Sequence, residues 1–289
     1  MLNQTNRKRA IVAMVLFAIF DLIIWLKIWQ SSAVLPAEIK FLDVGQGDAS
    51  LIRLTGGQSI LIDGGPNSGI TGQLDRAMGQ SIKYIDLVAV SHPQRDHFAG
   101  ILSVLESYRV GAFLYSGREP TENDLEWQEL KNKLEAGSVP KIVLGGGDFI
   151  KIGDSRLEIF SPGPELWQSG ELNDTSLVMR LVTPSARALF VGDAGDASEK
   201  FLAGLGDISA EILKVGHHGS KYSSSPDFLA LVKPLVSIIS VGAQNNYGHP
   251  SPLTLDRLRN QSSAVFRTDS NGTVNINLGE GKLRVFTEK

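Results

Sequence analysis

The sequence predicts a mixed α/β domain in which two β-sheets pack face to face and are covered by helices. Two observations favour this fold. From Glu38 onward, short apolar segments alternate with Gly-rich turns, which is typical of strands, and segments with helical spacing separate the groups of strands. The length of 289 residues is ample for a sizeable core, in one large domain or two small ones.

A long apolar segment at 11–29 precedes this pattern and is interrupted only by Asp21 and Lys27. A helix needs about 20 such residues to cross a bilayer, so we expect a transmembrane anchor here. Three basic residues at 7–9 precede the segment, and no comparable cluster follows it. The positive-inside bias therefore predicts a cytoplasmic N-terminus at 1–10 and an extracytoplasmic position for the rest of the chain.

The outer end of this segment allows two interpretations. Trp25 and Trp29 suit the membrane interface at the end of an anchor. The small residues at 31–33 alternatively offer a cleavage site, which would make the segment a signal peptide and the protein secreted. Because the apolar segment is long for a signal peptide, we favour an uncleaved anchor, followed by a linker at 30–37 and one folded domain at 38–289.

The predicted strands and helices follow one another in a regular order. In the first half, strands are expected at 39–42, 49–54, 59–62, 87–90 and 112–115, and helices at 72–79, 98–108 and 122–136. In the second half, an apolar segment at 142–144 leads into the turn 145–148, and strands are expected at 157–160, 176–182, 188–191, 211–215 and 235–241. Helices at 197–205 and 253–260 accompany these strands, and two strands close the chain. The turn at 145–148 lacks the Lys-Ser/Thr of a phosphate loop, so we interpret it as a tight turn.

Composition limits the chemistry that the domain can perform. The chain contains no cysteine, so disulfides and thiolate metal sites are excluded, and a metal must be held by His, carboxylate, amide or water. The net charge of −3 provides no general basic field. Contact with a nucleic acid therefore requires a local basic patch.

Candidate metal ligands recur in loops that follow predicted strands. They are Asp63, His92, Asp96, His97, Asp193, His217 and His218; His249 lies farther along, after the predicted strand at 235–241. A single Asp at a strand end more often caps a turn, and a single His more often forms a local hydrogen bond. The joint pattern, however, places four of the five histidines in such loops, where reactive residues are common. It predicts a metal centre.

These residue types suit a hydrolytic centre. Neutral imidazoles and a few carboxylates can hold a metal while one position stays open for water. Two metals about 3.5–4 Å apart can bind both the attacking and the leaving oxygen of a phosphoryl transfer, and a metal can lower the pKa of bound water to about 7. We expect one or two divalent metals, Zn²⁺ or Mn²⁺, with Asp193 as the best candidate for a shared ligand.

The order of these residues resembles the metallo-β-lactamase superfamily. The resemblance is carried by Asp63-Gly64-Gly65, His92-x-x-x-Asp96-His97, Asp193 and His217/His218. Five further motifs are similar to the C-terminal hydrolase domain of the ComEC competence proteins: Phe41-Leu42-Asp43-Val44-Gly45-Gln46-Gly47-Asp48-Ala49, Ser91-His92-Pro93, Asn173-Asp174-x-Ser176-Leu177-Val178, Leu213-Lys214-Val215-x-His217-His218-Gly219-Ser220 and Gly248-His249-Pro250. The resemblance covers nearly all of the chain from Glu38. The many-helix channel region of ComEC lies outside it, so we expect no DNA translocation.

The resemblance implies a four-layer αββα sandwich with the metals at one edge. It also implies a role for each candidate ligand. His92 would serve a first metal, Asp193 would bridge, and the second metal would be held by Asp96, His97 and one of His217/His218. Asp63 would orient the ligands from behind.

One position departs from the family pattern. Gln94 stands where the superfamily usually has His and where ComEC-like domains often have Asp. Asn173 or Asp174 falls near the place where other members carry a further His. The neutral amide of Gln94 is a weaker metal ligand than the His or Asp of the family pattern. We therefore expect weak or exchangeable binding of the first metal.

Loops beside the predicted centre supply candidate substrate groups, namely Ser220, Lys221, Asn245, Tyr247 and His249. Their hydroxyl, ammonium, amide and imidazole groups suit a phosphate or the protonation of a leaving alkoxide. The expected catalytic residues are Asp96, Asp193, His249 and Lys221. Alternatively, Ser220 and Lys221 only begin a solvated loop, and Tyr247 packs on the surface.

Together these features predict a membrane-anchored, extracytoplasmic, metal-dependent hydrolase. The ComEC resemblance implies a phosphodiesterase or nuclease that acts on DNA, with DNA-uptake machinery as a partner. Two alternatives stay open. One is hydrolysis of another ester, a lactone or a lactam, because this superfamily is broad. The other is a non-catalytic domain that binds nucleic acid or a partner, which Gln94 favours. The sequence leaves the oligomeric state open.

Overall fold

The structure is a computed structural model that describes residues 4–31, 36–120, 124–168, 170–279 and 281–289. The chain divides into two compact units, Met1–Leu35 and Pro36–Lys289. The first unit contains helix α1 (Gln4–Ser31). By its length and composition, the part Asn6–Lys27 is a candidate membrane span, with a mean hydropathy of 2.4. The side chain of Trp29 and the linker residues 32–35, which include part of the candidate cleavage site, lie outside the described part of the chain.

The second unit contains two β-sheets. The first has the strand order β15-β14-β1-β2-β3-β4-β5-β6. Its strands are β1 (Glu38–Phe41), β2 (Ser50–Arg53), β3 (Ser59–Ile62), β4 (Tyr84–Ala89), β5 (Arg109–Tyr115), β6 (Lys141–Val143), β14 (Val274–Asn277) and β15 (Arg284–Thr287). The second has the order β13-β12-β11-β10-β9-β8-β7. Its strands are β7 (Phe149–Ile152), β8 (Ser155–Ser161), β9 (Val178–Val182), β10 (Arg187–Phe190), β11 (Ile212–Lys214), β12 (Val236–Ile239) and β13 (Ala264–Arg267).

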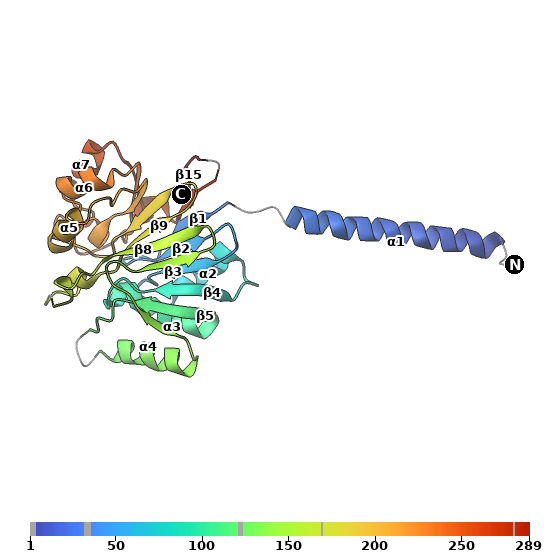
Figure 1. Cartoon of the computed structure of the whole chain (residues 1–289), viewed down its shortest axis with the longest axis horizontal. Coiled ribbons are helices and arrows are strands. Elements are labelled where there is room, and N and C mark those ends of the chain that lie inside the picture. Colours follow the sequence, from blue (N-terminus) through green and yellow to red (C-terminus); the bar gives the residue numbers. More distant parts are fainter. Residues whose placement is uncertain (1–3, 32–35, 121–123, 169, 280) are drawn as a thin grey trace. The chain divides into compact units, whose positions relative to one another are not determined.

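Helices cover the outer face of each sheet. The first sheet is covered by α2 (Gly69–Met78), α3 (Arg95–Ser107) and α4 (Leu125–Ala136), and the second by α5 (Asp196–Ala203), α6 (Pro226–Val232) and α7 (Pro252–Asn260). In Figure 1, α3 and α4 lie on one side of the strands, and α5, α6 and α7 lie on the other. Four short elements complete the unit: α8 (Thr268–Asn271) and the 3-10 turns η1 (Leu166–Gln168), η2 (Asn173–Thr175) and η3 (Gly216–Gly219).

Three apolar layers hold the sandwich together. Between the sheets, the rings of Phe41 and Phe190 stack with centroids 6.0 Å apart, within one buried cluster that draws on both sheets. A second cluster joins the first sheet to its helices through buried residues such as Trp127, and a third joins the second sheet to its helices through Phe228. Burying one such aromatic side chain contributes about 1.5–3 kcal/mol. The predicted αββα sandwich is therefore confirmed.

Strand direction brings the candidate ligands to one edge. Strands β3 to β6 are parallel neighbours in the first sheet, and β10 to β13 are parallel neighbours in the second. Asp63 directly follows β3, the segment 91–97 follows β4, Asp193 follows β10, and His217 and His218 follow β11. The carboxyl ends of parallel strands lie at the same edge of a sheet, where functional loops gather in such folds.

The start of α3 differs from the prediction of a helix at 98–108. The helix begins at Arg95, so Asp96 and His97 belong to its first turn rather than to the preceding loop. Pro93 restricts the residue before it to extended backbone, and Gln94 takes an extended N-cap conformation. The helix then starts directly after Gln94 and gives two candidate ligands a rigid support.

The strand prediction is wrong in two places. Strand β7 is absent from it, because this short segment follows a Gly-rich turn and is only half-buried as an edge strand. Three strands, rather than two, follow α7. Strand β13 completes the second sheet, whereas β14 returns to the first sheet and pairs antiparallel with β1. Polar residues flank β13 in the sequence, so the segment lacks the apolar pattern that would predict a strand.

Candidate metal centre

Loops at this edge of the sandwich bring most of the predicted ligands into one buried cluster. The exposed fraction is 2% or less for Asp63, His92, His97, Asp193 and His218. Asp96 and His217 lie at the rim, where about a third of each side chain is exposed. The inner residues of the cluster are therefore shielded from solvent, and its rim is accessible from one side.

His97 lies in the middle of this cluster. Its Nδ1 is 3.0 Å from Asp63 Oδ2 and 3.3 Å from Ser91 Oγ, and its Nε2 is 3.4 Å from Asp193 Oδ1. Asp63 is itself fixed, because it accepts hydrogen bonds from the amide of Ser91 at 2.7 Å and from the hydroxyl of Ser91 at 2.9 Å. A carboxylate that holds the Nδ1 of an imidazole and leaves its Nε2 for a metal is a common arrangement.

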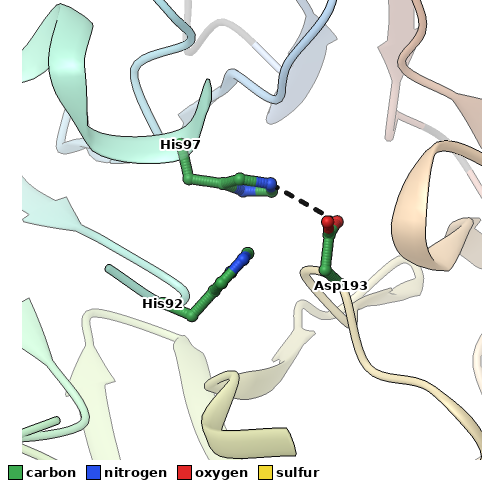
Figure 2. A group of neighbouring side chains, drawn as sticks. All are labelled: His92, His97 and Asp193. Atoms are coloured by element: carbon green, nitrogen blue, oxygen red, sulfur yellow. Dashed lines mark ion pairs between the residues drawn. The ribbon is translucent and has the colours of Figure 1, made fainter. Parts of the chain in front are cut away.

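His92 lies beside His97, with the ring centroids 4.2 Å apart. Its Nδ1 is 3.1 Å from Ser91 Oγ. Among the described residues, its buried Nε2 has no hydrogen-bond partner, and the same holds for His97 Nε2 and Asp193 Oδ1. Figure 2 shows both imidazoles turned toward Asp193. Buried polar atoms without hydrogen bonds are costly, so three that converge on one point fit a bound cation.

His218 reaches the cluster from the second sheet. Its Nδ1 is 2.9 Å from the carbonyl oxygen of Ser240, and its Nε2 is 3.2 Å from Asp96 Oδ2 and 3.8 Å from Asp193 Oδ2. His217 is more exposed, and its Nε2 is 4.0 Å from Asp193 Oδ2. Of the two neighbouring histidines, the geometry favours His218 as a ligand and leaves His217 in the pocket wall.

The backbone at these two histidines is strained. His217 has a φ of 49° and His218 a φ of 52°, a left-handed conformation that non-Gly residues seldom adopt. Asp63 also has a positive φ, of 59°. Such outliers cost about 1–3 kcal/mol each and cluster at functional sites. The fold therefore accepts strain at three residues of this cluster.

The charges of the cluster favour a cation. Burial opposes ionisation of Asp193, but His218 and His97 hold the pKa of this carboxyl well below its usual value. Burial likewise opposes protonation of His97 and His218, yet Asp193 and the other carboxylates raise the pKa of His97 well above its usual value and that of His218 to about 10. Burial and the neighbouring His97 lower the pKa of His92 to about 3. Without a metal, the cluster thus contains one neutral imidazole, two protonated imidazoles and ionised carboxylate. A divalent metal would replace the protons of His97 and His218 and leave imidazole and carboxylate donors, which suit it.

Among the described residues, four sets of three ligand atoms are compact enough to hold a metal, since the atoms of each set lie within 4.8 Å of one another. Two sets include the buried Asp48, one with Asp63 and His97 and one with Asp193 and His218. The other two are His92, His97 and Asp193, and Asp96, His97 and His218. Asp193 also lies within this limit of Asp48 and His218, so it faces both sides of the cluster.

The two neutral amides of the prediction meet beside His92. The Nε2 of Gln94 donates to the Oδ1 of Asn173 at 2.5 Å. Asp174 lies next to Asn173 in η2, and its carbonyl accepts a hydrogen bond from Ser198 Oγ at 3.4 Å. Asn173, rather than Asp174, is therefore the partner of Gln94.

A pocket of about 330 Å³ opens above the cluster. Its lining is formed by Gln46, Pro66, Gln94, Arg95, Asp96, Asp193, His217, His218, Tyr247 and His249. The rings of Tyr247 and His249 stack at 5.9 Å with an interplanar angle of 17°, and His249 lies 5.7 Å from the ring of His217. Burial and His217 lower the pKa of His249. An aromatic wall and a neutral imidazole therefore stand beside the candidate ligands.

Three of the predicted substrate residues lie outside this pocket lining. Asn245 is used within its own loop, because its Nδ2 donates to the carbonyls of Gly242 and His249. Ser220 is buried, and its Oγ accepts from the amide of Tyr222. Lys221 is exposed, with its Nζ 5.0 Å from the ring centroid of Tyr222.

Two residues of the cluster are absent from the sequence prediction. Asp48 is buried and forms an ion pair with Lys214, which is equally buried at the end of β11. Asp48 Oδ1 is also 3.3 Å from His218 Nδ1. Two signals in the sequence point to them: Asp48 ends a Gly-flanked turn, and Lys214 is a cation inside an otherwise apolar strand.

Comparison with known proteins assigns the family. The model of the metallo-beta-lactamase superfamily matches residues 42–243. The chain belongs to this superfamily. Members of the metallo-β-lactamase superfamily are typically metal-dependent hydrolases, and they bind divalent metals.

Relatives within this superfamily are competence proteins. The chain is 29% identical to ComE operon protein 3 of Bacillus subtilis over 255 residues, and 29% identical to competence protein ComA of Neisseria gonorrhoeae over 267 residues. These alignments cover 82% and 86% of this chain but only 32% and 34% of the relatives. The chain therefore spans about a third of the length of these relatives. Its similarity to ComEC-type proteins is confirmed.

Solved structures share the fold. The metallo-β-lactamase fold protein YhfI from Bacillus subtilis aligns with a TM-score of 0.56 at 13% identity, over 83% of this chain and 99% of that protein. At this low identity the likeness shows the fold alone.

Proposed function

We propose that this chain is a membrane-anchored, extracytoplasmic, metal-dependent phosphodiesterase that cleaves DNA. The observation that carries the proposal is the convergence of three buried imidazole Nε2 atoms, those of His92, His97 and His218, on the carboxylates of Asp193 and Asp96 beneath an open pocket. The similarity to competence proteins, which serve DNA uptake, supports DNA as the substrate.

The proposed ligands divide between two metal positions. His92, His97 and Asp193 would hold one divalent metal, and Asp96 and His218 would hold another, with Asp193 as the shared ligand. A bound Zn²⁺ or Mn²⁺ would supply Lewis-acid polarisation of a phosphoryl oxygen and a water molecule of lowered pKa. The chain contributes the fixed orientation of the imidazoles through Asp63, Ser91 and Ser240.

Residues of the pocket would bind and orient the phosphodiester. Asp96 stands between His218 and the pocket, where its partly exposed carboxylate can accept a hydrogen bond from water. His249 has a lowered pKa and is largely neutral at pH 7, so its N–H can donate to a phosphoryl oxygen. Tyr247 is 72% exposed and offers a ring on which a nucleobase can stack. Lys221, exposed beyond the lining, would contact the strand outside the pocket.

The proposed location rests on α1. Its apolar part has the length and hydropathy of a membrane span, and basic residues at 7–9 precede it. The positive-inside bias then places the domain outside the cytoplasm. There it would meet incoming DNA and, by the similarity to competence proteins, the DNA-uptake machinery.

The test uses the full-length chain in detergent, with labelled single-stranded and double-stranded DNA in the presence of Mn²⁺, Zn²⁺ or a chelator. We expect metal-dependent cleavage that chelator abolishes. Asp96→Ala should lower the rate by at least about 100-fold, because metal assistance supplies several kcal/mol. The matched control is Asp256→Ala, since Asp256 is an exposed residue of α7 that pairs with Arg259 on the same helix. This control should cleave like the parent.

Two outcomes would overturn the proposal. Equal cleavage by Asp96→Ala and the parent would contradict the assignment of the site. Metal binding without cleavage of any phosphoester would contradict the proposed reaction. If metal binds and no phosphoester is cleaved, turnover of an ester, a lactone or a lactam would favour another hydrolase. Turnover of none of these substrates would favour a binding domain, which the neutral Gln94–Asn173 pair also suggests.

A further inference from the structure

A buried ion pair lies directly behind the candidate metal centre. Lys214 and Asp48 are each 2% exposed, and the Nζ of Lys214 contacts Asp48 Oδ2. Lys214 also donates to the carbonyl of Val215 at 2.9 Å. Neither residue lines the pocket, so the pair has no access to a substrate.

Asp48 connects this pair to the proposed ligands. Its Oδ1 is 3.3 Å from His218 Nδ1, and its Oδ2 is 3.9 Å from His97 Nδ1. Its backbone amide donates to the carbonyl of Asp96 at 3.2 Å. A single residue therefore contacts the side chains of two candidate ligands and the backbone of a third.

Asp48 and the backbone hold His218 from the side opposite Asp96. The Nδ1–H of His218 donates to the carbonyl of Ser240 at 2.9 Å, and Nε2 faces Asp96. Asp48 Oδ1 lies 3.3 Å from the same Nδ1 as a charge contact without a hydrogen bond, and the ion pair between Asp48 Oδ2 and Lys214 fixes the carboxylate in this position.

A role in stability alone does not explain the pair. Buried ion pairs are often no more stabilising than apolar residues of similar volume, because both charges lose their hydration. Lys214 lies in β11 between buried apolar neighbours, where an apolar side chain would fit the pattern of the strand. The cost of burying both charges is therefore better accounted for by their contacts to the ligands.

We propose that Asp48 and Lys214 form a positioning pair, in which the ion pair with Lys214 holds the carboxylate of Asp48 in place and Asp48 orients His218 and His97 for the metal. This inference rests on the proposed metal centre but not on DNA as the substrate. Neither residue touches the reacting atoms. Partners that orient metal ligands from behind typically change metal affinity by about 10–100-fold when they are removed.

The experiment measures Mn²⁺ affinity and thermal stability of the full-length chain in detergent. Asp48→Asn/Lys214→Met removes both charges together and avoids an unpaired buried ion. Lys214→Gln keeps a hydrogen-bond donor for Asp48 and removes only the cation. The matched control is Glu158→Gln/Arg180→Met, which removes another mostly buried ion pair of the second sheet, away from the proposed ligands.

We expect the affinity for Mn²⁺, measured by the free-Mn²⁺ signal in electron paramagnetic resonance, to fall about 10–100-fold in the double variant and by less in Lys214→Gln. The Tm with Mn²⁺ should exceed the Tm with chelator by the most in the parent, by less in Lys214→Gln and by the least in the double variant. The control should change Tm equally with metal and with chelator. These readouts separate a positioning role from a purely structural one.

Parent-like Mn²⁺ affinity in the folded double variant would overturn the inference, and so would an equal loss in the control. If the double variant does not fold, Lys214→Gln decides, with reduced affinity supporting the inference and parental affinity refuting it. Failure of the parent to bind Mn²⁺ or Zn²⁺ would remove the metal centre and this inference together. Failure to cleave DNA with metal binding intact would remove only the proposed function.

Discussion

The three inner imidazoles differ in what holds them. Carboxylate Asp63 fixes His97, and the carbonyl of Ser240 with Asp48 fixes His218. In the described part of the chain, the Nδ1 of His92 has only the neutral hydroxyl of Ser91 as a partner. The neutral amides of Gln94 and Asn173 stand beside the first position as well. Fewer charged groups therefore support the first metal than the second, and we expect tighter binding at the second.

Gln94→Asp should strengthen the first position. A carboxylate is a better oxygen ligand than an amide for a divalent metal, so we predict at least about tenfold tighter binding of a second Mn²⁺, equivalent to about 1.4 kcal/mol. Titration with Mn²⁺ and counting of bound metal per chain provide the measurement. Gln46→Asp adds the same charge elsewhere in the pocket lining and serves as the control. An equal gain in the control would mean that charge alone, and not ligation, accounts for the change.

At this scale, the residue types of the centre can be predicted from the sequence, but their partners cannot. Asp63, Asp193 and the histidines are conspicuous because they follow strands. Asp48 and Lys214 meet only when a turn of the first sheet and a strand of the second come together. No local pattern encodes that contact, and the same holds for the hydrogen bond between Gln94 and Asn173.

Individual elements supply the rigid supports of the site. The first turn of α3 carries Asp96 and His97, so their positions follow those of a helix that packs on the first sheet. On the other sheet, Glu199 of α5 fixes the start of α6, because its carboxylate accepts from the amide of Ser225 at 2.8 Å and from the amide of Ser224. Helix α6 packs against the same layer as β11, which leads into the His217-His218 turn.

Glu199 predicts a dependence of stability on pH. Burial raises its pKa above the usual value of 4.5. A raised folded pKa means that the contribution of Glu199 to the free energy of unfolding is complete below about pH 4.5 and is lost as the pH rises through the folded pKa. We therefore predict that the difference in unfolding free energy between the parent and Glu199→Gln decreases as the pH rises from 4.5 toward 8.

Denaturation of both full-length proteins across this pH range, with fluorescence detection, measures that difference. Both proteins contain the same site carboxylates, so their titration cancels in the comparison. Glu199→Gln should also lose about 1–3 kcal/mol where it leaves the amide of Ser224 or Ser225 without an acceptor. A difference that grows with pH would contradict the assignment.

Element types are predicted better than element ends. Most helices and strands follow from periodicity, but the short helix α6 is absent from the prediction. Helix α3 begins three residues before its predicted start because Pro93 and Gln94 set its N-terminus. Strand β7 lacks a strong apolar pattern because an edge strand is half solvated. Local propensity carries too little information at such boundaries.

The whole molecule combines a candidate membrane helix with a two-sheet domain. The layers could be predicted from strands grouped between helices, since each apolar face requires a cover. The return of β14 and β15 to the first sheet could not be predicted, because pairing between the two ends of a domain leaves no signal in a single sequence. This pairing places β1 inside the first sheet, between β14 and β2.

The membrane orientation is testable on intact bacterial cells that express the full-length chain. We predict that added protease digests the domain, because basic residues at 7–9 retain the N-terminus in the cytoplasm. Replacing Arg7, Lys8 and Arg9 together with Gln should reduce the digested fraction. Full protection of the parent in intact cells, with digestion only after lysis, would place the domain in the cytoplasm.

The central claim is that the buried His and Asp cluster forms a metal centre that cleaves phosphodiesters. Its most direct test is the rate of cleavage of labelled DNA by the full-length chain with Mn²⁺, compared between the parent and Asp193→Asn. This variant keeps the shape of the side chain and removes the charge that faces His97 and His218. We predict metal-dependent cleavage by the parent and a loss of at least about 100-fold in Asp193→Asn, because the charge contributes to metal binding worth several kcal/mol. Cleavage by Asp193→Asn at the parental rate, or cleavage by the parent that persists in chelator, would contradict the claim.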